Sequence, residues 1–336
     1  MASVEVEISD LRGWAEQVGR ASKDMGSAHG YGTGNIADAD FGRILEVITG
    51  DYAVLLPKFH AVLQADSGGL DMTSGALIAT ANDYKKMDER SRSHFTKLPG
   101  GETAHTTDDG VANGFDDTAP AAAKLVPPDD GGANLPEVSF GWLLDKVCDL
   151  IVWVGGPDPR EYVTKWIAGD IKKAARQASA WQHVAECAET VRANLDTGKA
   201  AIARTWKGPA ATASSGHMDK WHTVLTDQST AMRKMSGHLK DAIEQAVKMA
   251  QVVVDIIHTV IDLVSAAWSG ASIPVFGQWK LIKTVKEAIT MVNSARKVIQ
   301  TFWSAMTMIK DLIAAGVNAF SVDALPPTPS TAEVPG

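Results

Sequence analysis

Cysteine and clustered basic charge are scarce in this 336-residue sequence, and each scarcity excludes a class of protein. Only two cysteines are present, which excludes a disulfide framework and a cysteine-rich metal site. Cys148 and Cys187 could form one bridge or stay apart. Lysine and arginine number 32 against 40 acidic residues, for a net charge of -8. No basic cluster of the kind that binds nucleic acid stands out, so we expect no nucleic-acid partner.

The first ten residues lack the features of a secretory leader. Val4, Val6 and Ile8 alternate with Glu5 and Glu7, whereas a signal peptide has a basic start followed by a continuous apolar run. We therefore expect a protein that is made in the cytoplasm and carries no cleavable signal peptide.

Catalytic motifs are missing as well. The sequence contains no phosphate-binding glycine-rich lysine loop, no His-Glu-x-x-His and no nucleophile elbow. His217 and His222 are five residues apart, so on a helix they point to different sides and make a poor metal pair. A separate toxin domain needs about a hundred residues, and only a short tail follows Phe320. These features predict a protein that is not an enzyme and has no cofactor or metal.

Proline divides the chain. Five prolines lie between positions 99 and 136, in a stretch rich in glycine, aspartate, alanine and threonine, and four more lie between 326 and 335. Between Arg160 and Val322 only Pro209 and Pro274 occur, so this region can hold long uninterrupted helices. We predict a helical module at 1–98, a flexible acidic linker at 99–138, a long-helix domain at 139–320 and a disordered tail at 321–336.

Apolar residues recur in steps of three and four along three segments of the long-helix domain. The first two segments predict seams that face each other as antiparallel arms, with Gln228 as a polar interruption in the second seam. The third segment, about 278–320, predicts another helix packed on them. The seams comprise, in the first arm, Ile167, Ile171, Ala174, Ala178, Trp181, Ala185, Ala188, Val191, Leu195, Ile202 and Trp206, and in the second, Trp221, Leu225, Met232, Met235, Leu239, Ala242, Ala246, Met249, Val253, Ile256, Val260 and Leu263.

The amino-terminal hundred residues also read as helical. A first helix, with Leu11, Trp14 and Val18 inward, is expected to end at the glycine-rich run 26–34, and a later helical pair is expected to reverse at 67–69. The whole prediction is an all-α fold: a small N-terminal helical hairpin or bundle, then an elongated antiparallel hairpin of long helices with a third helix packed on it.

A Trp-Lys-Gly tripeptide lies between the two longest seams. Trp206 can cap the seam, Gly208 permits the chain to reverse, and Pro209 suits the first position of the next helix. Similar tripeptides occur at 153–155 and 268–270, but their contexts fit a bend less well. The alternative for each is a core tryptophan beside a turn glycine.

A second motif is Tyr84-Lys85-Lys86-Met87-Asp88. It places an aromatic hydroxyl and a carboxylate one helical turn apart on the same face, where a docking protein could read both. Its position near the end of a helix, just before the linker, distinguishes it from a chance pair.

These motifs carry two family resemblances. The segment from Arg160 to about Trp268, with Trp206-Lys207-Gly208 at its bend, resembles the WxG helical-hairpin (ESAT-like) substrates of actinobacterial type VII (ESX) secretion. Residues 1–100, with Gly69-Leu70-Asp71 and Tyr84 to Asp88, look like the excreted-virulence-factor (type VII secretion target) family. The resemblances together cover about two thirds of the chain.

The resemblance implies a function and partners. In such families a tryptophan-glycine bend and a Tyr-x-x-x-Asp/Glu signal form a composite export signal that a hexameric secretion ATPase recognises. This implies export to the cell surface or beyond, with roles for Tyr84, Asp88, Trp206 and Gly208. The chain departs from the family pattern in fusing two modules, and no Tyr-x-x-x-Asp/Glu follows the Trp206 hairpin. The second half of the signal would come from Tyr84 or from a partner, which could be a second helical-hairpin protein.

Two other functions stay open from the sequence. In a membrane-active effector, residues 252–276 would insert after export, although the same residues continue the heptad seam, so membrane contact is not favoured. A cytoplasmic scaffold or chaperone would carry another effector and never leave the cell. Liposome leakage tests the first alternative, and abundance in the culture filtrate tests the second.

Overall fold

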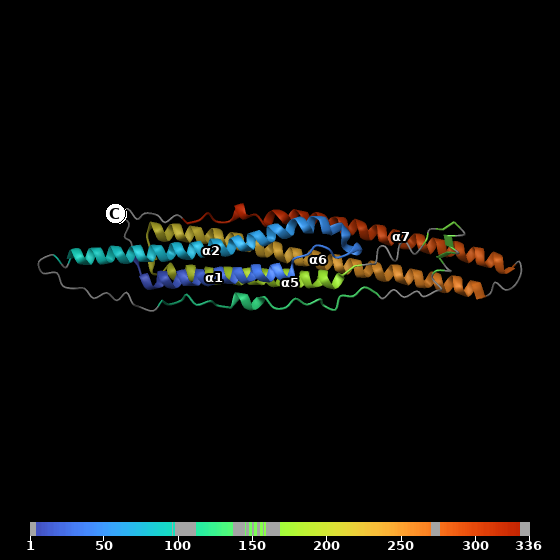
Figure 1. The fold of residues 1–336 in the computed structure, drawn as a ribbon, viewed down its shortest axis with the longest axis horizontal. Helices are drawn as coiled ribbons and strands as arrows, with labels where there is room; N and C mark the ends of the chain where they lie inside the picture. Colours follow the sequence, from blue (N-terminus) through green and yellow to red (C-terminus); the bar gives the residue numbers. More distant parts are fainter. Residues whose placement is uncertain are drawn as a thin grey trace.

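A computed structural model gives the fold of the chain, and it describes residues 5–95, 97, 112–136, 145, 148–149, 151–152, 155–156, 158, 169–269 and 276–329. Five long helices make up most of this part: α1 (Ile8–Asn35), α2 (Glu46–Phe95), α5 (Ile171–Ile202), α6 (Pro209–Ser269) and α7 (Phe276–Gly316). Figure 1 shows them side by side in an elongated bundle. The all-α prediction is confirmed.

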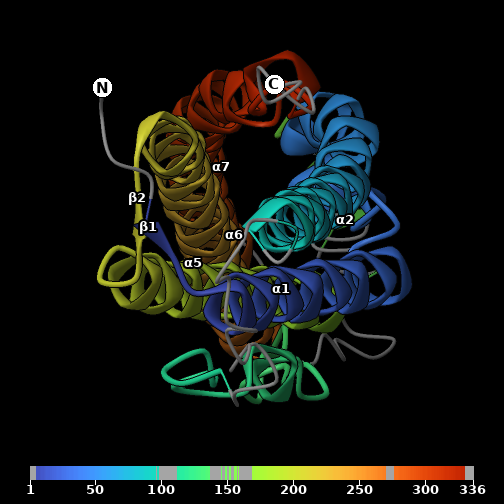
Figure 2. The same ribbon diagram turned by 90° about the vertical axis from the view of Figure 1, so that its left-hand side faces the viewer.

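The bundle is long because its helices are long. At 1.5 Å per residue, the 50 residues of α2 and the 61 residues of α6 extend about 75 and 90 Å. Viewed along the bundle, α1 and α5 lie side by side, with α6 and α2 flanking them and α7 opposite (Figure 2). Helices from both halves of the sequence thus surround one hydrophobic core, while the division into folding units at 98 and 139 stays a prediction.

The apolar seams predicted for α5 and α6 are confirmed. The first seam is buried from Ile171 to Trp206, and Ile167 lies outside the described residues. The second seam is buried from Trp221 to Val260, except that Ile256 is partly buried, and Leu263 at its end is also partly buried. Gln228, its polar interruption, is buried too and donates from Nε2 to Asp66 Oδ1 of α2 at 3.0 Å. On α7, which corresponds to the third predicted helix, apolar residues are buried at steps of three and four from Val285 to Ile313, whereas Ile282 is exposed.

The predicted end of the first helix at the glycine run is wrong, because α1 continues to Asn35. Gly26 and Gly32 of this run, and Gly19 before it, instead let α1 and α2 approach closely, whereas nothing lies within 4 Å of a Cβ added at Gly30 or Gly34. A Cβ at Gly19 or Gly26 would lie 3.2 Å from a serine Oγ of α2, and one at Gly32 would lie 3.1 Å from Phe59 Cε1. Packing across the interface outweighs the helix-propensity loss of about 1 kcal/mol per glycine.

The predicted reversal at residues 67–69 is also wrong, since α2 is one helix from Glu46 to Phe95 and runs on through Pro57. Ser67 and Ser22 each donate a hydroxyl hydrogen bond to the other's carbonyl oxygen, at 3.0 and 2.9 Å. A Cβ at Gly69 would lie 2.8 Å from the Trp221 ring of α6. Residues 67–69 are therefore a place where α1 and α6 pack closely against α2. The N-terminal hairpin reverses between α1 and α2 instead.

The predicted flexible linker is wrong for residues 112–136, which lie along the outside of α1 and α5 (Figure 2). Phe115 is buried, and Arg20 of α1 forms an ion pair with Asp117 at 2.9 Å. Asn194 of α5 accepts from the backbone and hydroxyl of Thr118 at 3.0 and 2.8 Å. The rest of the predicted linker, residues 99–111 and 137–138, lies outside the described residues.

The predicted disorder of the tail is wrong for residues 321–329. After η3 (Val317–Ala319), Phe320 is buried with its ring 5.6 Å from Phe59 and 5.7 Å from Trp181. A further turn, η4 (Val322–Ala324), contacts α2. The sequence signal of disorder came from prolines, which suit an extended segment packed on a surface equally well. Residues 330–336 lie outside the described residues.

Among the described residues, α6 alone is long and apolar enough to cross a membrane, with a window of mean hydropathy 1.6 of which 44% is buried in the bundle. A buried core helix of a soluble protein meets the same criterion. The finding therefore does not by itself distinguish a membrane segment from a core helix.

Gly198 of α5 allows a close helix crossing with a measurable consequence. A Cβ there would overlap Gln17 Oε1 and lie 2.9 Å from Trp14 Cδ1, both on α1. We expect Gly198→Ala to lower the free energy of unfolding by about 1–3 kcal/mol, measured by urea denaturation. Gly237→Ala is the control, because nothing lies within 4 Å of its added Cβ, and it should raise stability by up to about 1 kcal/mol. Equal stability of the two variants would contradict the close packing.

Candidate functional site: the bend of the helical hairpin

The bend between α5 and α6 is built by residues 203–209. Backbone hydrogen bonds from Ala203 to Lys199 and from Thr205 to Ile202, at 3.2 and 3.1 Å, close the last turn of α5. Gly208 has φ of +115°, which a residue with a side chain adopts only with strain. Pro209 begins α6, as predicted for a first helical position, where a missing backbone N–H is harmless.

A short β-ladder that the sequence analysis missed holds the bend in place. β1 (Glu5–Val6) pairs antiparallel with β2 (Trp206–Lys207), so that Val6 lies opposite Trp206. Next to the ladder, Glu7 N donates to Thr205 O at 3.1 Å, and Thr205 Oγ1 donates to Asp10 Oδ2 at 2.9 Å. The alternation of valine and glutamate at 4–8 was the available signal, since alternation is typical of a strand.

Trp206 is buried, with 2% of its surface exposed, among aromatic side chains of two other helices. Its ring lies edge-on to Trp14 of α1 at 6.2 Å and to Tyr84 of α2 at 6.4 Å between centroids. The indole Nε1 donates to Tyr84 Oη at 3.4 Å. The structure therefore brings together two of the residues that the sequence singled out, although 122 positions separate them.

The other half of the tyrosine motif faces outward. Tyr84 is half-buried, whereas Asp88 is exposed one turn further along α2. Asp88 Oδ2 accepts from Arg92 in an ion pair within the helix, and Lys86 pairs with Asp83 at 3.5 Å. Tyr84 is thus partly exposed and Asp88 is exposed one turn further along α2, and the Tyr84 ring contacts the buried Trp206.

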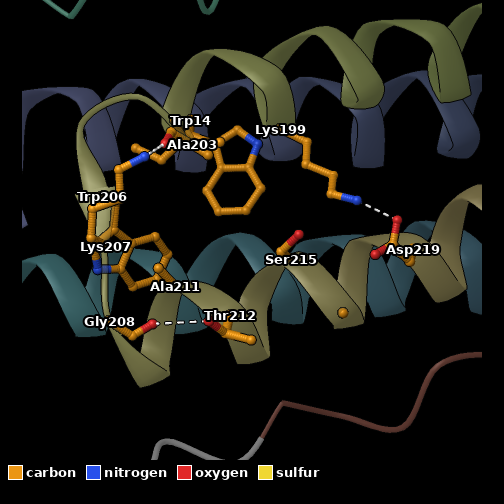
Figure 3. Close-up of a pocket in the computed structure, with 12 residues that line it drawn as sticks. Trp14, Lys199, Ala203, Trp206, Lys207, Gly208, Ala211, Thr212, Ser215 and Asp219 are labelled. Carbon is orange, nitrogen blue, oxygen red and sulfur yellow. Dashed lines mark hydrogen bonds and ion pairs between the residues drawn. The ribbon is translucent and has the colours of Figure 1, made fainter. Parts of the chain in front are cut away.

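Two cavities flank Trp206. One of about 420 Å³ lies inside the bend, between the end of α5 and the start of α6, with Trp14 and Trp206 on its apolar side and the Lys199–Asp219 ion pair on its polar side (Figure 3). The buried Trp14 Nε1 has no hydrogen-bond partner among the described residues. The other cavity, of about 490 Å³, lies between α2 and α6. Trp206 therefore forms a shared wall of two hollows.

The remaining polar candidates have structural partners. His217 Nε2 lies 3.0 Å from Thr73 Oγ1 and accepts from Trp221 Nε1 at 3.1 Å, and burial lowers the pKa of His217. His222 pairs instead with Asp196 of α5. Burial raises the pKa of the Cys187 thiol to about 12, which makes it a poor nucleophile. In the described part of the chain no three His, Cys, Asp or Glu side chains are placed to hold a metal.

The other two Trp-x-Gly tripeptides lie partly outside the described residues. Trp153 and Val154 lie outside the described residues, and so does Gly270. Residue 268 lies within the last turn of α6, so the chain there is still helical.

A family model described as a WXG100 like domain matches residues 134–304. The match takes in α5, the bend, α6 and most of α7, more than half of the 336 residues. No curated protein matches the chain. Tyr84 and Asp88 lie outside the matched range, so the contact between Tyr84 and Trp206 joins that range to the N-terminal helices.

Proposed function

The chain belongs to the WXG100-like family, whose members are helical proteins associated with type VII secretion, and from this premise we propose that it is a non-enzymatic substrate or trafficking module of that pathway. Its signal is composite: Tyr84 and Asp88 form one half, and Trp206, Gly208 and Pro209 form the other. The partner that reads it is the secretion ATPase, and the destination is the cell surface or the exterior.

One observation carries this proposal, the contact of Tyr84 with Trp206 at the bend. The aromatic hydroxyl and the indole meet at 3.4 Å, and Asp88 is exposed one turn away. The recognised residues and the tryptophan that positions them therefore lie together in one chain, without a second chain. We propose that the fusion of the two modules supplies in one polypeptide what a second helical-hairpin partner would otherwise contribute.

The burial of Trp206 indicates which residues of the composite signal contact a partner and which only position them. With 2% of its surface exposed, the Trp206 ring offers little area to a partner. Its contacts with Trp14 and Tyr84 instead fix the position of Tyr84, whose half-exposed edge and the nearby Asp88 are accessible. We assign Tyr84 and Asp88 to recognition and Trp206 to positioning, with Gly208 and Pro209 shaping the bend.

Export of point variants tests the proposal. Tyr84→Ala and Asp88→Ala should each reduce the amount in the culture filtrate at least about tenfold, corresponding to a loss of about 1.4 kcal/mol of docking energy. The comparison requires a strain with a working secretion ATPase, with the cell-associated protein quantified in parallel.

Glu89→Ala is the matched control. It removes the same charge from the next position of α2, which points about 100° away around the helix, and it should be exported normally. Circular dichroism should show unchanged helicity in all three variants. Normal export of both Tyr84→Ala and Asp88→Ala would refute the signal.

A membrane-active effector is a second candidate because α6 is long and apolar enough to cross a bilayer, and Val252 is exposed. Against it, Val253 and Val260 are buried in the seam, so insertion would require α6 to leave the bundle. Leakage of liposomes by the purified protein would favour this candidate.

A further inference from the structure

The larger cavity beside Trp206 is a groove between α2 and the first turns of α6. Its volume is about 490 Å³, and its apolar lining includes Trp14, Leu77, Trp206 and Met218. One wall is formed by α2 from Thr73 to Asp83 and the other by α6 from Ala210 to Lys220. A groove with a largely apolar surface and polar groups in its lining is suited to an extended peptide segment.

A segment of the same chain already crosses this groove. The segment after η4, residues 325–329, reads Leu-Pro-Pro-Thr-Pro. Leu325 packs against the hydrophobic core, and Pro326 and Pro327 face residues 219–224 of α6 across a smaller cavity of about 340 Å³. Pro327, Thr328 and Pro329 then form part of the groove lining opposite α2 and α6. Figure 1 shows this stretch running from α7 toward the bend end of the bundle.

The composition of the segment suits such a crossing. Proline fixes φ near −65° and has no N–H to satisfy, so a proline-rich segment is extended before it binds and loses little entropy when it does. Phe320 anchors the segment at its start, because its ring is buried against Phe59 and Trp181. The segment is thus held on the bundle by the buried Phe320 ring, whereas Pro327 and Thr328 are exposed.

We propose that residues 325–329 are a displaceable intramolecular strap that closes the α2–α6 groove beside Trp206. Its regulatory role rests on the proposed function: the groove lining reaches Asp83, the residue before Tyr84, so the strap restricts access to this part of α2 until the secretion machinery displaces it. Exposed residues after a buried anchor fit this role, because residues 325–329 can leave the groove while Phe320 stays bound and keeps them close enough to return.

Cysteine labelling tests the strap without using export. In a background with Cys148 and Cys187 replaced by alanine, Ser214→Cys and Ala76→Cys place a thiol on each wall of the groove. Truncation after Ala324 removes the strap but keeps Phe320. We expect a bulky polyethylene-glycol maleimide to react about tenfold faster at both positions in the truncated protein. A synthetic peptide of residues 325–336, added in excess, should restore the protection.

Ser93→Cys is the matched control, because Ser93 is exposed on α2 and does not line the groove. Its labelling rate should be the same in the full and truncated chains. Equal rates with and without the strap at positions 76 and 214 would overturn the proposal, and so would a matching acceleration at position 93, which would indicate general loosening.

Export of the truncated chain tests the regulatory half separately. If the strap restricts the signal, truncation should raise the exported fraction, and Tyr84→Ala should abolish that gain. Faster labelling combined with reduced export would overturn the regulatory role, but would still support the proposal that residues 325–329 cover the groove. Normal export of the truncated Tyr84→Ala chain would refute the proposed signal itself, whatever the labelling shows.

Discussion

Replacing Trp206 by alanine is expected to abolish export and to lower the free energy of unfolding by about 3–5 kcal/mol. The ring is buried between Trp14 and Tyr84, so its removal leaves a cavity. It also removes the hydrogen bond from Trp206 Nε1 to Tyr84 Oη, which connects Tyr84 to the bend. Export is measured in the culture filtrate, and stability by urea denaturation of the purified protein.

Because a destabilised protein can fail to be exported for other reasons, Trp206→Phe separates the two effects. Phenylalanine keeps an aromatic ring in the site but cannot donate to Tyr84 Oη. Trp221→Phe is the control, because Trp221 of α6 is buried as Trp206 is and likewise donates its indole N–H, in this case to His217. We expect reduced export for Trp206→Phe alone. Similar export of the two phenylalanine variants would contradict a role of the Trp206–Tyr84 contact.

Asp66→Asn is expected to stabilise the protein by up to about 4 kcal/mol at pH 8 and by less than half as much, about 1.6 kcal/mol, at pH 5. Asp66 lies in the core between α2 and α6, and burial raises the pKa of its carboxyl from 3.8 to about 7. Between these values the folded state holds a proton that the unfolded state has released. Stability therefore falls as the pH rises, by about 1.4 kcal/mol per unit for this group.

Hydrogen bonding supports the same conclusion. Gln228 Nε2 donates to Asp66 Oδ1 at 3.0 Å, whereas Asp66 Oδ2 and Gln228 Oε1 are buried without partners among the described residues. A proton on Asp66, or the amide N–H of asparagine, supplies the donor that Gln228 Oε1 lacks.

Urea denaturation at pH 5 and pH 8 measures the difference. Asp71→Asn, at an exposed position of the same helix, should stay within about 0.5 kcal/mol of the parent at both values. If the stability of the parent and of Asp66→Asn depended on pH in the same way, ionising Asp66 in the folded protein would cost no free energy, which would contradict the prediction.

Much of the fold follows from the sequence pattern alone. The steps of three and four in α5 and α6 report which face of each helix is apolar, and the scarcity of proline allows both helices to be long. Those two features were enough to predict the antiparallel arms, and the sequence Trp206-Lys207-Gly208-Pro209 between them predicted the position of the bend. They gave no information about what covers each face.

Errors in the prediction occurred where local propensity and tertiary packing disagree. Glycines at 26–34 and 67–69 read as helix ends, yet α1 and α2 continue through them. Gly26, Gly32 and Gly69 closely approach serine, phenylalanine and tryptophan side chains of neighbouring helices, and this packing offsets the lost propensity. Prolines at 326–329 read as disorder, yet the segment lies against α2 and α6. In each case the deciding contact comes from a distant part of the chain.

The sequence by itself determined that this protein is a set of long amphipathic helices with a tryptophan-glycine bend, because helical periodicity is a local property. Only the tertiary structure decided that Tyr84 meets Trp206, that residues 5–7 brace the bend and that the proline-rich segment crosses the neighbouring groove. These contacts join positions about a hundred or more residues apart, and their geometry depends on how the helices align in the bundle, which no spacing within one helix specifies.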